Sequence, residues 1–142
     1  MNEEFEYEIS VDETEYPTSP KEHIFIAREL IDRNIDFDNL ALRFVGDFEK
    51  GIDYKGDLSE FRSKLKTHSE ILRKFGSYKI SLHSGSDKFS IYPEFRDIIP
   101  GRFHVKTAGT NYLEGLRVIA DSKPDLLDIL CQVKVFHWPL SW

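Results

Sequence analysis

Polar side chains that could bind a ligand or catalyse a reaction gather near the ends of four segments that each predict a β-strand. Because the carboxyl ends of parallel strands meet at one edge of a sheet, we expect these side chains to lie close together. Strand by strand, the candidates are Asp12, Glu13 and Glu15, then Arg43, Asp47 and Glu49, then His83, Ser84, Ser86, Asp87 and Lys88, and finally His104, Lys106, Thr107 and Thr110. This convergence is the strongest sign of an active site in the sequence.

His83 is the first candidate for a metal ligand, because it follows an apolar strand and precedes Gly85 in a loop. A neutral imidazole there could bind a divalent metal, with carboxylates such as Glu13 or Asp87 completing the ligand shell. The alternative is a histidine whose nitrogens are satisfied by backbone groups, and position alone favours neither.

Two other histidines differ in their surroundings. His104 is expected on the strand face opposite Phe103 and Val105, where it either lines a barrel interior or packs beneath helices. His68 lies on the apolar stripe of a predicted helix, so packing is the better interpretation for it than metal binding.

The charged residues near the strand ends allow acid–base and anion-binding chemistry. Lys88 and Lys106 could bind a carboxylate or stabilise an enolate oxygen, although lysines at strand ends are often solvated charges. Glu13 could abstract a proton or bind metal, or be a solvated residue of an acidic stretch. The sequence contains no P-loop, GxGxxG, CxxC, HExxH or nucleophile-elbow motif, so none of these signals is specific alone.

Hydrophobic periodicity predicts strands that alternate with helices. The strands are expected at residues 5–11, 40–45, 78–82 and 103–106. Ser19, Pro20 and Glu22 form a capping box that starts the first helix. Its apolar stripe is expected to consist of Ile24, Ala27, Leu30 and Ile31.

The second predicted helix begins at Asp57 or Ser59 and ends at Gly76, and further helices are expected around residues 112–119 and 122–130. Strand–helix alternation predicts an α/β fold made of parallel (β/α) units. Doubly wound sheets and (β/α)8 barrels both fit this pattern. A complete barrel needs about 250 residues, so a chain of 142 residues could hold only part of one.

Composition excludes several classes of protein. The net charge of −6 and the lack of basic clusters argue against nucleic-acid binding. No apolar run approaches the roughly 20 residues that span a membrane, and the acidic start lacks the features of a signal peptide. Cys131 is the single cysteine, so no intrachain disulfide can form. We therefore expect a soluble cytoplasmic protein.

Five motifs, in order along residues 6–130, resemble the bacterial tagaturonate epimerase family. They are Val11-Asp-Glu-Thr-Glu15 with Pro17-Thr-Ser-Pro20, Arg43-Phe-Val-Gly46, Lys50-Gly-Ile-Asp-Tyr54, Ser81-Leu-His-Ser-Gly-Ser-Asp-Lys-Phe-Ser-Ile-Tyr-Pro93 and Phe103-His-Val-Lys-Thr-Ala-Gly-Thr110. The resemblance implies an isomerase that interconverts tagaturonate and fructuronate in hexuronate breakdown. It also implies a divalent metal cofactor, a keto-uronate substrate and a fold that is part of a TIM-like (β/α)8 barrel.

The resemblance also suggests roles for residues at the strand ends. Glu13 and Asp87 are expected to act as acid–base groups, and His83 and His104 are expected to hold the metal. Four residues are expected to bind the substrate carboxylate or oxyanion, and they are Lys88, Lys106, Arg43 and Thr110. The stereocentre that changes lies beta to the keto group, which favours retro-aldol cleavage and re-addition; direct proton or hydride shuttling is the alternative.

The family enzymes are much longer, so we expect residues 1–130 to be a barrel portion and residues 131–142 an atypical tail, truncated or frame-shifted. Such a portion leaves sheet edges unpaired and should self-associate. Two other functions stay open, a metal-dependent aldolase or ketose isomerase on the same scaffold, and a non-catalytic remnant.

Overall fold

A computed structural model describes residues 5–107, 111–123 and 125–126. The chain divides into two units, Met1–Ala108 and Gly109–Trp142, and each is described by itself. The strands of the first unit are β1 (Glu8–Ser10), β2 (Asn39–Ala41), β3 (Lys79–Leu82) and β4 (Phe103–Val105). Its helices are α1 (Pro20–Asp32), α2 (Leu58–Phe75) and α3 (Tyr92–Ile98), and the second unit contains α4 (Asn111–Ser122).

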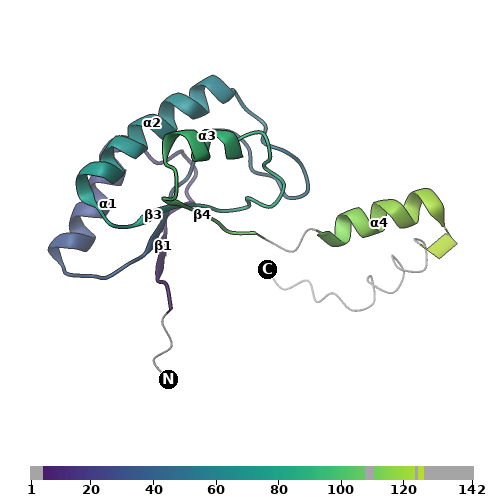
Figure 1. Cartoon of the computed structure of the whole chain (residues 1–142), viewed down its shortest axis with the longest axis horizontal. Helices are drawn as coiled ribbons and strands as arrows, with labels where there is room; N and C mark the ends of the chain where they lie inside the picture. Colours follow the sequence, from purple (N-terminus) through teal and green to yellow (C-terminus); the bar gives the residue numbers. More distant parts are fainter. Residues whose placement is uncertain (1–4, 108–110, 124, 127–142) are drawn as a thin grey trace. The chain divides into compact units, whose positions relative to one another are not determined.

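The four strands form one parallel sheet in the order β1-β2-β3-β4, so each strand pairs with its neighbour in the chain. Helices α1, α2 and α3 lie over the same face of this sheet (Figure 1). Barrel units place their helices on one face, whereas a doubly wound sheet carries helices on both. The predicted α/β class with parallel units is confirmed, and the arrangement favours barrel units.

The hydrophobic core fills the space between the sheet and these three helices. Parallel register aligns Ile9, Leu40, Ile80 and Phe103 in one row across the sheet. Leu40 and Ile80 are fully buried. Because side chains alternate along a strand, the opposite face of the same strands carries Glu8, Ser10, Ser81 and His104. The sheet therefore presents a polar face away from the helices.

Helix α1 begins as predicted. The Ser19 hydroxyl accepts a hydrogen bond from the Glu22 amide at 3.3 Å, and the Glu22 carboxylate accepts one from the Ser19 amide at 2.7 Å. Pro20 opens the first turn, where its missing N–H costs nothing. The capping box is confirmed.

Loss of this cap should be measurable. We expect Ser19→Ala to lower the free energy of unfolding by about 1 kcal/mol, because the Glu22 amide at the helix start loses its hydroxyl acceptor. Urea titration followed by circular dichroism measures the change. Ser63→Ala, an exposed position inside α2, is the matched control and should change stability by less than about 0.5 kcal/mol; equal losses would contradict the capping role.

The buried face of α1 is rotated from the predicted stripe. His23 and Ala27 are fully buried, whereas Ile24 and Ile31 are 38% and 43% exposed. The reason lies beneath the helix, where His23 fits between His68 and Tyr78. The predicted stripe was right for Ala27 and wrong for the two isoleucines.

Helix α2 has the predicted ends. The Asp57 carboxylate accepts hydrogen bonds from the amides of Ser59 and Glu60, and Gly76 follows the last turn. Gly76 has extended backbone angles, so it needs no left-handed conformation. A Cβ atom there would lie 2.6 Å from the Tyr78 ring, so close packing requires the glycine.

Some elements differ from the predictions or lie outside the described residues. Helix α3 was not predicted, because it is a single short segment of seven residues with a proline in its first turn. Residues 125–126 are helical as expected, but the rest of segment 122–130 and the predicted tail 131–142 are mostly or wholly outside the described residues. No helix among the described residues has the length and apolarity that a membrane span requires.

Candidate active site

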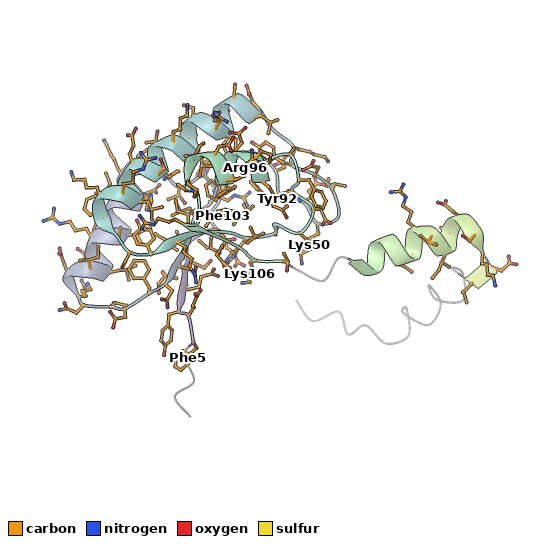
Figure 2. The ribbon with its side chains drawn as sticks, in the orientation of Figure 1. Phe5, Lys50, Tyr92, Arg96, Phe103 and Lys106 are labelled. Carbon is orange, nitrogen blue, oxygen red and sulfur yellow. The ribbon has the colours of Figure 1, made fainter. Side chains whose placement is uncertain are left out.

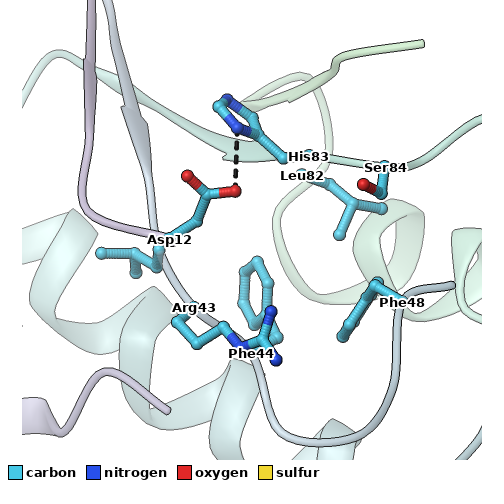
Figure 3. A pocket seen from close by; sticks show the side chains of 8 residues that line it. Asp12, Arg43, Phe44, Phe48, Leu82, His83 and Ser84 are labelled. Atoms are coloured by element: carbon cyan, nitrogen blue, oxygen red, sulfur yellow. Dashed lines mark ion pairs between the residues drawn. The ribbon is translucent and has the colours of Figure 1, made fainter. Parts of the chain in front are cut away.

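One imidazole joins two carboxylates on the polar face of the sheet. His83 Nε2 lies 2.6 Å from Glu8 Oε1, and His83 Nδ1 lies 2.9 Å from Asp12 Oδ2. All three side chains are mostly buried, with 14%, 21% and 17% of the His83, Glu8 and Asp12 side chains exposed. Figure 3 shows the His83–Asp12 contact from close by. Glu8 in β1 and Asp12 just after β1 therefore lie on either side of His83, which follows β3.

His104 joins this group from β4. Its Nδ1 lies 3.1 Å from the Ser81 hydroxyl and 3.4 Å from Glu8 Oε2. His104 is the most exposed member, with 44% of its side chain accessible. It thus lies on the sheet face opposite the helices, which is one of the two positions predicted for it. The structure brings together the two histidines that were predicted as metal ligands, with Glu8 between them.

Glu8 is the electrostatic centre of the group. Burial alone would raise the pKa of its carboxyl, but hydrogen bonds with Ser81 and His83 and the nearby imidazoles hold that pKa below its ordinary value. The carboxylate is therefore ionised at neutral pH. Its Oε2 atom is buried without a hydrogen-bond partner among the described residues. A buried anionic oxygen of this kind is a favourable place for a cation.

Two hollows border His83. The smaller, of about 60 Å³, is lined by Asp12, Arg43, His83 and Ser84 over an apolar base that includes Phe44 and Phe48 (Figure 3). The larger, of about 530 Å³, is lined by Ser10, Val11, Glu13, Thr14, His83 and Lys106. Each hollow thus combines a carboxylate, a cationic side chain and His83, which suits an anionic polar ligand.

The histidine and carboxylate side chains of this group provide some of the ligands that a divalent cation needs. Among the described residues, no three His, Cys, Asp or Glu side chains are already arranged to hold a metal ion. Yet two ligand atoms about 2.1 Å from one ion are about 3.4 Å apart in tetrahedral geometry, which is the separation of Glu8 Oε2 and His104 Nδ1. The contact of Asp12 with His83 Nδ1 resembles the outer carboxylate that orients a metal-binding histidine. The described residues supply part of a ligand set.

Four of the predicted site residues therefore border the His83 hollows, namely Glu13, Arg43, His83 and Lys106. Asp87 and Lys88 border neither hollow. The Asp87 carboxylate accepts a hydrogen bond from the Gly51 amide, and the Lys88 side chain is fully buried beneath the loops. The placement of Lys88 differs from the substrate contact expected of it. Thr110 lies outside the described residues.

Glu8 was not predicted as a site residue, and Asp12 was predicted at a strand end but without a role. Candidates were expected beyond the strand ends, whereas Glu8 lies inside β1. Strand alternation contained the signal, because Glu8, Ser10 and Asp12 share the face that Ile9 and Val11 leave to polar residues. Their distance to His83 could not be predicted, since it depends on how side chains cross from β1 over β2 to β3.

Comparisons with known proteins agree with one another. The family model described as UxaE, tagaturonate epimerase, matches residues 1–137. A curated relative, the tagaturonate/fructuronate epimerase of Thermotoga maritima, is 56% identical over 135 residues. That match covers 95% of this chain and 28% of the relative. The chain thus spans little more than a quarter of the curated relative's length.

Solved structures give the same result for the fold. The native crystal structure of fructuronate-tagaturonate epimerase UxaE from Cohnella laeviribosi is 48% identical, with a TM-score of 0.82. A glycerol complex of that enzyme gives a TM-score of 0.81 at the same identity. Each match covers 93% of this chain and 27% of the crystallised chain. At this identity and coverage, the described fold is that of the corresponding segment.

Proposed function

The chain belongs to the tagaturonate epimerase family, and from this premise we propose that it forms part of an isomerase active site that interconverts tagaturonate and fructuronate with a divalent cation. The observation that carries the proposal is the contact of Glu8 in β1 with both His83, which follows β3, and His104 in β4. Because the chain spans 28% of its curated relative, the activity is proposed for this segment together with the remaining units of such an enzyme.

The reaction must invert a carbon that lies beta to the keto group. The hydrogen on that carbon is not acidified by the carbonyl, so simple proton exchange is slow. Removal of the proton from the hydroxyl on the same carbon lets the adjacent carbon–carbon bond break. Its electron pair passes to the carbonyl side as an enolate, and an aldehyde is left on the other fragment. Re-addition of the enolate to the opposite aldehyde face, with return of the proton to oxygen, gives the epimer.

The residues around the larger hollow suit these steps. Glu13 lies on its rim and is proposed to take the hydroxyl proton and return it. Lys106 and Arg43 are proposed to bind the substrate carboxylate and the enolate oxygen, because each places a cation beside His83. Asp87 is not given the acid–base role, since its carboxylate faces the Gly51 amide.

Glu8, His83 and His104 are the residues proposed to hold the cation, with Asp12 orienting His83. A divalent cation bound there would supply positive charge beside the oxygen that becomes negative. With a cation bound, His83 would keep its Nδ1 toward Asp12 and offer the ion its Nε2, which in this structure contacts Glu8 Oε1 at 2.6 Å. The proposal for the metal rests on this donor set and on Oε2 of Glu8, which is buried, has no hydrogen-bond partner among the described residues and lies 3.4 Å from His104 Nδ1.

A chimera tests the proposal directly. This chain would replace the matching 135 residues of the Thermotoga maritima relative, and the purified protein would be incubated with D-tagaturonate. We expect D-fructuronate to appear and the reverse reaction to occur. A chelator should abolish turnover, and Mn²⁺ or Zn²⁺ should restore it.

Four results would distinguish the alternatives. Trapping of a three-carbon aldehyde during turnover supports cleavage, whereas its consistent absence with label exchange at the stereocentre would refute it. Fragment products without the epimer would indicate an aldolase, and turnover of other ketoses but not of tagaturonate would indicate a ketose isomerase. A folded chimera with no turnover and no metal binding would leave only the non-catalytic interpretation.

The isolated chain is expected to self-associate. Within Met1–Ala108, β1 and β4 each pair with a strand on one side only. Beside β4, an open groove of about 590 Å³ is lined by apolar residues and Arg96, among them Tyr92 and Phe103 (Figure 2). Light scattering should give a mass above the 16.6 kDa of one chain, rising with concentration. A single mass of 16.6 kDa at all concentrations would contradict this prediction.

A further inference from the structure

Lys88 has an unusual place for a lysine, because its side chain is 0% exposed. A buried ammonium is strongly unfavourable unless hydrogen bonds replace the water that it has lost. Here the ammonium donates to the carbonyl oxygens of Glu49 at 2.8 Å and Ile52 at 2.6 Å. Both acceptors belong to the loop between β2 and α2, whereas Lys88 lies on the loop between β3 and α3. The lysine therefore ties together two loops that follow neighbouring strands.

Two carboxylates, one from each loop, also connect the loops after β2 and β3. The Asp53 carboxylate accepts hydrogen bonds from the Ser90 amide and hydroxyl, at 3.2 and 3.0 Å. The Asp87 carboxylate accepts one from the Gly51 amide at 3.1 Å. Each loop thus provides charged groups that bind the backbone of the other. We call the set Asp53, Asp87 and Lys88 the loop clasp.

The loop clasp continues to the walls of the active site. The Lys88 amide donates to the Gly85 carbonyl at 3.3 Å, and the Gly85 amide donates to the Lys106 carbonyl at 3.1 Å. The Tyr92 hydroxyl also donates to the Gly85 carbonyl. A Cβ atom on Gly85 would lie 2.4 Å from the Val105 side chain, so this contact leaves no room for a larger residue. Lys88 is thereby connected to Lys106 through two backbone hydrogen bonds.

Both hollows at His83 depend on the segments that the loop clasp holds. Phe48 and Ser84, from the two clasped loops, line the smaller hollow, and Lys106 lines the larger. A displacement of about 1 Å at a binding group can reduce turnover on the order of 100-fold. Fixing these loops therefore affects catalysis even though Lys88 itself borders neither hollow.

We propose that Lys88 is a positioning residue, which holds the loops after β2 and β3 in the geometry that the reaction needs and does not contact the substrate. The proposal deepens the proposed function and rests on it. Asp53 and Asp87 act with Lys88, and the substrate whose turnover depends on them is a keto-uronate bound in the larger hollow, which His83 and Lys106 line. The buried ammonium stands in place of a hydrophobic side chain because it can donate hydrogen bonds to two carbonyl groups of the facing loop, which an apolar side chain cannot do.

The first test measures the clasp without any need for activity. Hydrogen exchange followed by mass spectrometry would compare the chain with its Lys88→Met variant, which keeps the volume but removes the charge. We expect exchange to increase at least tenfold in residues 47–55 and 83–91 and to stay unchanged in α1. Lys50→Met is the matched control, because Lys50 is an exposed lysine of the facing loop between β2 and α2 (Figure 2). Unchanged exchange in the Lys88→Met protein would overturn the proposal.

The second test separates positioning from substrate binding. In the chimera, Lys88→Met should lower kcat about 10- to 100-fold and change KM by less than about threefold. A KM raised more than tenfold at unchanged kcat would show a substrate contact and overturn the proposal. If Lys88→Met does not fold, Asp53→Asn decides, since it weakens the same connection from a more accessible position. An inactive parent chimera would refute the proposed function, while the exchange result would still decide the clasp.

Discussion

In the chimera, Glu8→Gln is expected to lower kcat/KM by at least about 100-fold, because Glu8 is proposed to hold the cation itself and loss of even an outer partner of a metal site costs up to about 100-fold. Glu8 contacts both His83 and His104, and its ionised carboxylate is the negative group between them. Glutamine keeps the shape and one acceptor oxygen but removes the charge. The same variant should weaken Mn²⁺ binding to the chain at least tenfold, as measured by isothermal titration calorimetry.

Glu6→Gln is the matched control for this prediction. Glu6 is also a carboxylate of the first segment, but it pairs with Lys79 at 2.7 Å and with Asn39 and borders neither hollow. We expect its turnover and metal affinity to stay within about twofold of the parent. Equal losses of turnover and metal affinity in both variants would mean that any negative charge near β1 contributes, and not Glu8 specifically. A fully active Glu8→Gln protein would show that Glu8 is not part of the site.

The folded protein is expected to lose about 4 kcal/mol of stability between pH 7 and pH 5, because two buried histidines must stay neutral. His23 and His68 lie with their Nδ1 atoms 3.0 Å apart, and His23 Nε2 lies 2.8 Å from the Tyr78 hydroxyl. Burial lowers the pKa of His23 to about 3, helped by His68. Burial likewise lowers the pKa of His68 to about 4, helped by Lys64 and opposed by the Thr18 backbone.

The direction of this pH dependence follows from the two histidine pKa values. Each folded pKa lies below the ordinary 6.5, so below pH 6.5 the unfolded chain takes up protons that the folded chain does not. The stabilisation is complete above pH 6.5 and falls with pH toward the folded values. At pH 5 each imidazole accounts for about 2 kcal/mol. Urea unfolding at pH 7, 6 and 5 measures the slope.

A single variant tests whether the two buried histidines cause this pH dependence. His23→Leu removes one of the two imidazoles and should reduce the slope between pH 6.5 and 5 to about half, whatever it costs at pH 7. Ile71→Val, a buried position in α2, should lower stability by about 1 kcal/mol at every pH and leave the slope unchanged. A parent protein of constant stability from pH 7 to 5 would contradict the buried neutral pair.

Local signals in the sequence predicted the local parts of the fold. Ser19, Asp57 and Gly76 mark helix ends through hydrogen bonds and contacts a few residues away, so they were found from the sequence. Strand positions were correct to within a few residues because apolar runs set them. The face of α1 was not predicted, since His23 is buried by partners 45 and 55 residues away.

The active site, too, has features that the sequence predicted and contacts that it could not predict. The gathering of polar residues at the strand ends follows from parallel topology, and His83, Arg43, Glu13 and Lys106 do lie together. Contacts between segments could not be predicted. Lys88 was expected to face a substrate because it follows His83 in the same loop, but loop curvature turns it into the interior against carbonyls almost 40 residues away.

The strand order β1-β2-β3-β4 has a consequence for how the protein is made. A ribosome releases the chain from its amino end, and in this order every new strand finds its pairing partner already synthesised. The sheet can therefore grow one strand at a time as the nascent chain emerges. Glu8 is synthesised 75 residues before His83, so its carboxylate stays hydrated until the residues after β3 have been made. The group of Glu8, His83 and His104 therefore cannot form before β4 has been synthesised.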